Sequence, residues 1–264
     1  MRELQEKDIL FGAAYYPEYM PYDRLQEDIA MMQKAGMNSI RIAESTWSTL
    51  EPAEGVYDFS YIDKTLAAAE EAGMYVIIGT PTYAIPSWLE KKCPEVMVFD
   101  GYSRKKYGKR QIMDIVHPVF RKCAENVICK LLEHTANVSC VIGFQIDNET
   151  KHYGTASPQV QRMFVEYLKT KFHTTEQLNE VFGLRYWSNS ISDWSDFPDM
   201  AGCIRGGLAC EFAKFQRSLA AEYLVWQSEL VKKYKRQDQF ITHNFDFEWK
   251  KFGADIAEKS GVSR

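Results

Sequence analysis

The chain has 264 residues, of which 45% are hydrophobic and 26% are charged, and its formal net charge is -4. This length and composition suit one large globular domain with a substantial core, or two smaller domains. The weak negative charge argues against nucleic acid as a partner, and the short basic runs at 104–106 and 232–236 do not reverse it.

No stretch of the sequence approaches the roughly 18 apolar residues that a membrane span needs. The N-terminal segment 1–8 is charged and lacks the apolar run of a signal peptide, so we expect no membrane partner and a cytoplasmic location. The 6 cysteines include no C-x-x-C pair. The sequence therefore predicts no metal site and no cofactor.

Short β-rich runs alternate with longer helical patterns along the chain. The predicted elements, in chain order, are strand 9–16, helix 22–35, strand 39–43, helix 61–72, strand 75–80, helix 119–135, strand 141–146, helix-rich segments 158–182 and 208–235, and strand 240–245. Gly36 and Gly73 each stand between a helix and the next strand, where a glycine cap is expected. The connection 81–118 is much longer than the usual βα loop of about 2–6 residues, which is typical of a functional loop.

This alternation predicts βα units and a parallel sheet. A doubly wound nucleotide-binding fold is disfavoured because no G-x-G-x-x-G or Walker-type motif follows a strand. Polar and aromatic residues gather instead just after the predicted strand ends, the positions that form the catalytic face of a βα barrel. They are Tyr16, Glu18, Arg41, Glu44, Thr82, Trp88, Asn148, Glu149, Asn244 and Asp246. We predict an α/β chain of the (β/α)8 TIM-barrel type, truncated after about five βα units.

The segment Asp147-Asn148-Glu149-Thr150 carries the strongest chemical signal, because it follows directly on the apolar run 141–146. An Asn-Glu pair at a strand end suggests a glycosidase. The retaining route uses two carboxylates about 5 Å apart, one as acid/base and one as nucleophile. Glu149 supplies one of them, and the alternative is a solvated carboxylate at a strand end.

Further motifs are spread over nearly the whole chain. They are Phe11-Gly12 to Pro17-Glu18, Ile40-Arg41-Ile42-Ala43-Glu44 with Trp47-Ser48, Leu50-Glu51-Pro52 to Tyr57-Asp58-Phe59, Thr80-Pro81-Thr82 with Pro86 and Trp88-Leu89, Pro94-Glu95-Val96, and Gln145-Ile146-Asp147-Asn148-Glu149. Together they resemble the N-terminal barrel of family 42 glycoside hydrolases, the β-galactosidases. The resemblance implies that residues 1–264 are the N-terminal part of a (β/α)8 catalytic barrel in a family of retaining, exo-acting galactosidases. It also implies that Glu149 is the general acid/base.

The resemblance assigns roles to four more residues. Arg41 matches an arginine that supports the catalytic centre, with an ion pair to Glu44 or Glu18 as the alternative. Arg110 matches an arginine that contacts the galactosyl unit and orients the acid, and Asn148 matches the residue expected to bind the sugar 2-hydroxyl. Trp187 falls where the family places an aromatic wall, with Trp194 as its rival.

The sequence departs from the family pattern in two places. Some members carry a four-cysteine zinc cluster, but the corresponding segments 111–114 and 150–154 contain no cysteine here. The family's nucleophilic glutamate follows the seventh strand, beyond the last residue of this sequence. We therefore expect the chain to be inactive alone, and Glu248 and Asp246 are the candidates for a second carboxylate within it.

Three interpretations remain open. The chain is the N-terminal part of a retaining β-galactosidase that acts on β-galactosides, or a sugar-binding or assembly module derived from the same barrel, or a piece of a longer gene product. Because an open parallel sheet exposes its edges and apolar helix faces, we also expect homo-oligomerisation or aggregation.

Overall fold

The computed structural model describes residues 9–20, 22–108, 112–203 and 206–245. Five strands of this part form one parallel sheet in the order β1-β2-β3-β4-β5. They are β1 (Gly12–Ala14), β2 (Ser39–Ile42), β3 (Tyr75–Gly79), β4 (Val141–Gln145) and β5 (Phe240–Thr242). Each connection leads to the neighbouring strand, as in a βα barrel, so the prediction of a barrel truncated after about five βα units is confirmed.

Eight α-helices accompany these strands in the described residues. They are α1 (Leu25–Lys34), α2 (Trp47–Leu50), α3 (Ser60–Glu71), α4 (Ser87–Lys92), α5 (Pro118–Thr135), α6 (Pro158–Phe172), α7 (Thr175–Phe182) and α8 (Gly207–Lys232). Short 3-10 turns lie at η1 (Pro17–Tyr19), η2 (Pro81–Tyr83), η3 (Pro94–Val96), η4 (Tyr186–Ser188), η5 (Trp194–Asp196) and η6 (Met200–Gly202). The long connection after β3 is thus more ordered than the sequence predicts, because η2, α4 and η3 each begin at or just after a proline.

Glycine ends two of these helices as predicted. Gly36 and Gly73 follow the last residues of α1 and α3 with φ of 80° and 66°. This left-handed conformation carries little penalty without a Cβ atom, so the chain can reverse there and enter the next strand.

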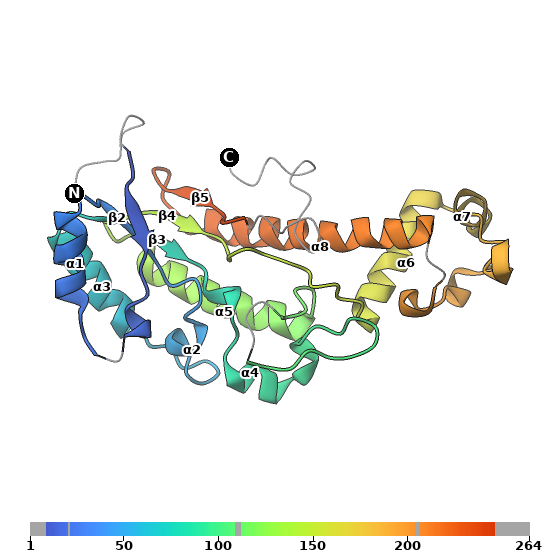
Figure 1. Ribbon diagram of the computed structural model, residues 1–264, viewed down its shortest axis with the longest axis horizontal. Helices are drawn as coiled ribbons and strands as arrows, with labels where there is room; N and C mark the ends of the chain where they lie inside the picture. Colours follow the sequence, from blue (N-terminus) through green and yellow to red (C-terminus); the bar gives the residue numbers. More distant parts are fainter. Residues whose placement is uncertain (1–8, 21, 109–111, 204–205, 246–264) are drawn as a thin grey trace.

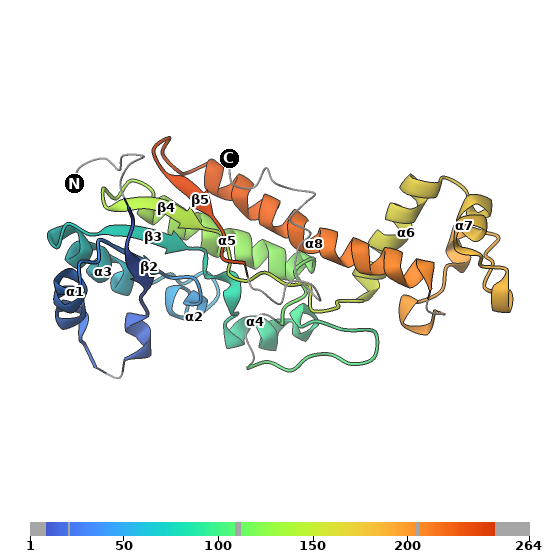
Figure 2. The same cartoon turned by 45° about the horizontal axis from the view of Figure 1, so that its top comes forward.

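The sheet separates an apolar face from a polar one. Ile40, Ile42 and Phe144 are fully or almost fully buried toward the layer of helices, and Figures 1 and 2 show α1, α3 and α5 along that face. Because side chains alternate along a strand, Arg41 and Gln145 point to the opposite face. That face holds a cavity of about 380 Å³ lined by both residues.

Helices α6 and α7 form an excursion away from the sheet, and the long helix α8 returns from it to β5 (Figure 1). Aromatic rings join α6 to α8, since Phe164 packs on Phe212 and Phe215 with centroids 4.9 and 5.3 Å apart.

Among the described residues, none of the helices has the length and apolar character to cross a membrane.

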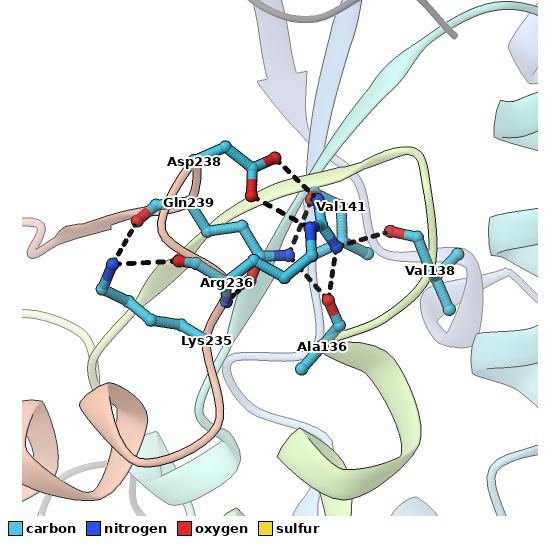
Figure 3. A network of polar contacts seen from close by, with 7 residues as sticks. All are labelled: Ala136, Val138, Val141, Lys235, Arg236, Asp238 and Gln239. Carbon is cyan, nitrogen blue, oxygen red and sulfur yellow. Dashed lines mark hydrogen bonds and ion pairs between the residues drawn. The ribbon is translucent and has the colours of Figure 1, made fainter.

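A polar network lies at the N-terminal end of β4, in the turn between α8 and β5 (Figure 3). The Arg236 guanidinium donates to the carbonyls of Val141 at 3.0 Å and Val138 at 3.2 Å, and also to that of Ala136. The Gln239 amide donates to Ala136 and Val141, each at 2.9 Å. These bonds satisfy carbonyls that the α5–β4 turn would otherwise leave without partners, and they fix β4 beside β5.

Candidate active site

The segment after β4 has an uncommon backbone. Asp147 and Glu149 adopt positive φ values of 47° and 46°. For residues other than glycine this conformation costs on the order of 1 kcal/mol or more, and it is concentrated at functional sites. The Glu149 N–H donates to the carbonyl of Asn244 at 2.8 Å, which ties the segment to the residues after β5.

Arg41 of β2 lies at the centre of the polar face. Its Nη1 donates to Gln145 Oε1 at 2.7 Å, and its Nη2 donates to Glu44 Oε1 at 2.8 Å. The Tyr16 hydroxyl donates to the same Glu44 oxygen at 2.5 Å. Burial and this bond raise the pKa of Tyr16 above its ordinary value, so the hydroxyl remains a donor at neutral pH.

Two charged atoms of this pair have no hydrogen-bond partner among the described residues. Both Arg41 Nε and Glu44 Oε2 are buried without one. Unpaired buried polar atoms are rare because desolvation is unfavourable, and they are typical of sites that bind a ligand. The Glu44 side chain is 2% exposed and that of Arg41 is 21% exposed, so Arg41 is the member of the pair that a ligand can reach.

Asn148 is connected to Arg41 through Gln145. The Gln145 amide donates from Nε2 to the Asp147 carbonyl at 2.8 Å and to Asn148 Oδ1 at 3.2 Å. Asn244 donates to the same Asn148 oxygen at 3.0 Å. Strands β2, β4 and β5 thus jointly set the orientation of the Asn148 amide.

Glu149 is half-buried beside an aromatic hydroxyl. Its Oε2 accepts a hydrogen bond of 3.1 Å from Tyr83, which belongs to η2 and is 6% exposed. The carboxylate is therefore held from the β3 side of the site, while its backbone is held from the β5 side.

Asp147 points away from this surface into the protein. Its side chain accepts hydrogen bonds from the hydroxyls of Thr82, at 2.7 Å, and Thr150. Burial raises the pKa of Asp147 to about 6, although both hydroxyls act in the opposite direction. Ionisation of a carboxyl with this pKa at neutral pH lowers the stability of the fold. Carboxyls with such shifted pKa values are found most often at functional sites.

No group of three or more His, Cys, Asp or Glu side chains within the described ranges is arranged to hold a metal ion. The segments 111–114 and 150–154 contain Asp114 and His152 but no cysteine. Burial lowers the pKa of His152 to about 4, so its imidazole is neutral at physiological pH. The absence of a bound metal stays a prediction.

Comparison with known proteins identifies the family. The model of glycoside hydrolase family 42, described as Beta-galactosidase, matches residues 14–260. The chain belongs to this family.

Individual relatives agree with this family 42 assignment. The β-galactosidase BgaA of a Thermus species is 31% identical over 252 residues, which cover 89% of this chain and 38% of that protein. The crystal structure of a β-galactosidase from Rahnella sp. R3 superposes with a TM-score of 0.89 at 28% identity, over 99% of this chain and 39% of that one. A catalytic mutant of Gan42B, a β-galactosidase from G. stearothermophilus, gives a TM-score of 0.88 over 97% and 39%. The family 42 chain described here therefore spans less than two-fifths of the length of these relatives.

The structure brings together three of the five residues that the sequence selected for the family 42 site. Arg41, Asn148 and Glu149 lie at the C-terminal ends of β2 and β4, and the first two are linked through Gln145. Arg110 lies outside the described residues, as do Asp246 and Glu248. The roles of the five selected residues, Arg41, Arg110, Asn148, Glu149 and Trp187, remain predictions.

Trp187 is not brought to this cluster. It belongs to η4, directly after α7, and α7 lies at the opposite end of the molecule from the sheet (Figures 1 and 2). Its side chain is 75% exposed, its φ is 55°, and its ring packs on Tyr186 with centroids 5.9 Å apart. The rival Trp194 is partly buried against the core of the excursion. An aromatic wall formed by either residue stays a prediction.

Sequence reasoning missed Gln145 and Tyr83. Gln145 lies within the predicted strand 141–146, where a polar side chain in an otherwise apolar run is a usable signal. Tyr83 is next to Thr82, and nothing in a lone tyrosine shortly after a proline distinguishes it from a core residue.

Proposed function

We propose that this chain forms the galactosyl-binding, acid/base part of a retaining β-galactosidase site. The observation that carries the proposal is the hydrogen-bonded series Arg41–Gln145–Asn148, which ends beside Glu149 at the C-terminal edge of a parallel sheet. Side chains at this edge of a βα barrel are the ones that contact substrate.

In this proposal, Glu149 donates a proton to the glycosidic oxygen and later accepts one from the attacking water. Asn148 binds the sugar 2-hydroxyl through its side-chain amide, whose orientation Gln145 and Asn244 set. Arg41, whose side chain is 21% exposed, offers an Nη N–H to another sugar hydroxyl.

The nucleophile is the open part of the mechanism. Glu44 is bound by Arg41 and Tyr16, so its place in the proposal is to anchor Arg41. Asp246 and Glu248 lie outside the described residues. We expect the chain alone to bind galactose without hydrolysing β-galactosides.

A second candidate is a sugar-binding or assembly module without catalysis. The proposal and a sugar-binding module differ in turnover, whereas an assembly module differs from the proposal in sugar binding as well.

The test combines calorimetry with galactose and an assay with nitrophenyl β-galactoside. The proposal expects measurable galactose binding that Arg41→Lys weakens, since lysine lacks the planar fork. Glu166→Gln is the control, because Glu166 is exposed and pairs with Lys169 on α6. Turnover that disappears in Glu149→Gln would show that a second carboxylate within the chain completes the site. Failure of the wild-type chain to bind galactose would contradict the proposal and the sugar-binding form of the second candidate, and would leave an assembly module.

A further inference from the structure

A closed ring of hydrogen bonds lies beneath the candidate site. The Asp147 N–H donates to Thr80 Oγ1 at 2.6 Å, and the Thr80 hydroxyl donates to Gln227 Oε1 at 2.6 Å. The Gln227 amide donates from Nε2 to Thr82 Oγ1 at 2.9 Å, and the Thr82 hydroxyl returns to Asp147 Oδ1 at 2.7 Å. All four side chains are buried, and Asp147, at 4%, is the most exposed of them.

The direction of this ring is set by its chemistry. A threonine hydroxyl has a single proton, so each threonine donates one ring bond and accepts the other. Gln227 donates through nitrogen and accepts through oxygen. Asp147 enters through its backbone N–H and closes the ring through its carboxylate. Removing one donor therefore leaves a buried acceptor without its partner.

The ring includes Asp147, one of the two residues of the segment 147–150 that have positive φ. Asp147 is held at its backbone N–H and its carboxylate by the ring, and at its carbonyl by Gln145. Asn148 and Glu149 follow directly. With three of its polar groups held, Asp147 has little freedom to relax to a more common φ.

We propose that the Thr80–Thr82–Gln227 ring is a positioning device for the site: it holds Asp147 in its left-handed conformation and so aims Asn148 and Glu149 at the sugar. This inference rests on the proposed function. In this proposal α8 also positions the site, because it carries Gln227. This helix follows the α6–α7 excursion in the chain.

Thr82→Val tests the ring because it removes the hydroxyl and keeps the shape of the side chain. We expect galactose binding to weaken about tenfold or more, since a buried acceptor of Asp147 loses its donor. Thr82→Ser restores the hydroxyl and should bind as the wild type does. Thr135→Val is the matched control, because Thr135 is also fully buried but its hydroxyl bonds within α5, to the Leu131 carbonyl.

Gln227→Glu breaks the ring at a residue that does not bond Asp147, by replacing the Nε2 donor with an acceptor. We expect the same loss of binding, which keeps the test open if Thr82→Val does not fold. Unchanged binding in both variants, or an equal loss in Thr135→Val, would overturn the proposal.

Crystal structures of the ligand-free variants separate this inference from the proposed function. The inference expects φ of Asp147 and Glu149 to leave their values of 47° and 46° in Thr82→Val and to keep them in Thr82→Ser. If the wild-type chain does not bind galactose, the proposed function fails. Unchanged φ values in Thr82→Val would then overturn the ring's positioning role independently.

Discussion

The two ends of β4 each carry a partly buried arginine network, and they differ in how many of the guanidinium nitrogens have a hydrogen-bond partner. At the N-terminal end, the Arg236 guanidinium uses all three nitrogens, on backbone carbonyls and on Asp238 (Figure 3). At the C-terminal end, Arg41 Nε has no partner within the described residues. The side chains are similarly exposed, at 28% and 21%, so burial does not explain the difference.

This difference in hydrogen bonding suggests that Arg236 serves stability and Arg41 serves function. Arg236 bonds mainly to carbonyls, which any sequence supplies, and it holds two turns together. Arg41 bonds to the side chains of Glu44 and Gln145. It lies at the C-terminal edge of the sheet, where Asp147 and Glu149 have strained, positive φ values. In βα barrels the C-terminal edge carries chemistry and the N-terminal edge carries stability. Substitutions at the two ends should therefore have different consequences.

The largest effect is expected from Arg41→Ala. It leaves the Glu44 carboxylate, 2% exposed, without its counter-charge, and breaking a buried pair in this way costs about 3–5 kcal/mol. Galactose binding should be lost as well. Urea denaturation and calorimetry measure the two effects. Arg24→Ala is the control, since its i,i+4 pair with Asp28 is more exposed and its loss should change stability much less. A loss of stability in Arg41→Ala no larger than in this control would contradict the buried-pair argument.

Arg236→Leu should lower stability by about 2–3 kcal/mol, because the carbonyls of the α5–β4 turn lose charge-assisted donors. Galactose affinity should stay at the wild-type value, in contrast to Arg41→Ala. The same urea and calorimetry measurements apply. Arg162→Leu, which removes a surface bond to Gln159, should change neither quantity measurably. A large change of affinity in Arg236→Leu would remove the distinction between the two ends.

Local signals explain why so much of this arrangement could be predicted from the sequence. The strands are short apolar runs, Gly36 and Gly73 mark helix ends, and Arg41 and Glu149 follow from their places at strand ends. Five consecutive parallel strands then bring those ends to one edge.

Contacts between distant segments could not be predicted in the same way. Gln227 joins Thr80 and Thr82 because one face of α8 packs against the end of β3, and helix periodicity does not specify which neighbour a buried glutamine meets. Arg236 is similar, since its place in a short basic run does not indicate that its guanidinium bonds backbone carbonyls. Long-range hydrogen bonds of this kind depend on the tertiary structure.

The smallest net change in stability is expected from replacing the Asp147 carboxyl. Burial raises its pKa from 3.8 to about 6 in the folded chain. A pKa raised on folding stabilises the native state below the unfolded value, and that contribution is lost as the pH rises through about 6. Above this range, ionised Asp147 destabilises the chain by an amount on the order of 3 kcal/mol.

Asp147→Asn removes that charge. The amide still accepts from Thr82 through Oδ1 and can donate to Thr150, so the ring stays closed while its bonds weaken. We expect a net gain of about 1–2 kcal/mol at pH 7–8, which disappears below about pH 4 in urea titrations. Asp193→Asn is the control with the opposite sign, because hydrogen bonds from Ser195 lower the pKa of Asp193. Galactose binding should survive in Asp147→Asn, since Thr82 keeps its acceptor. A gain that persists at pH 4 would show that it does not come from the buried charge.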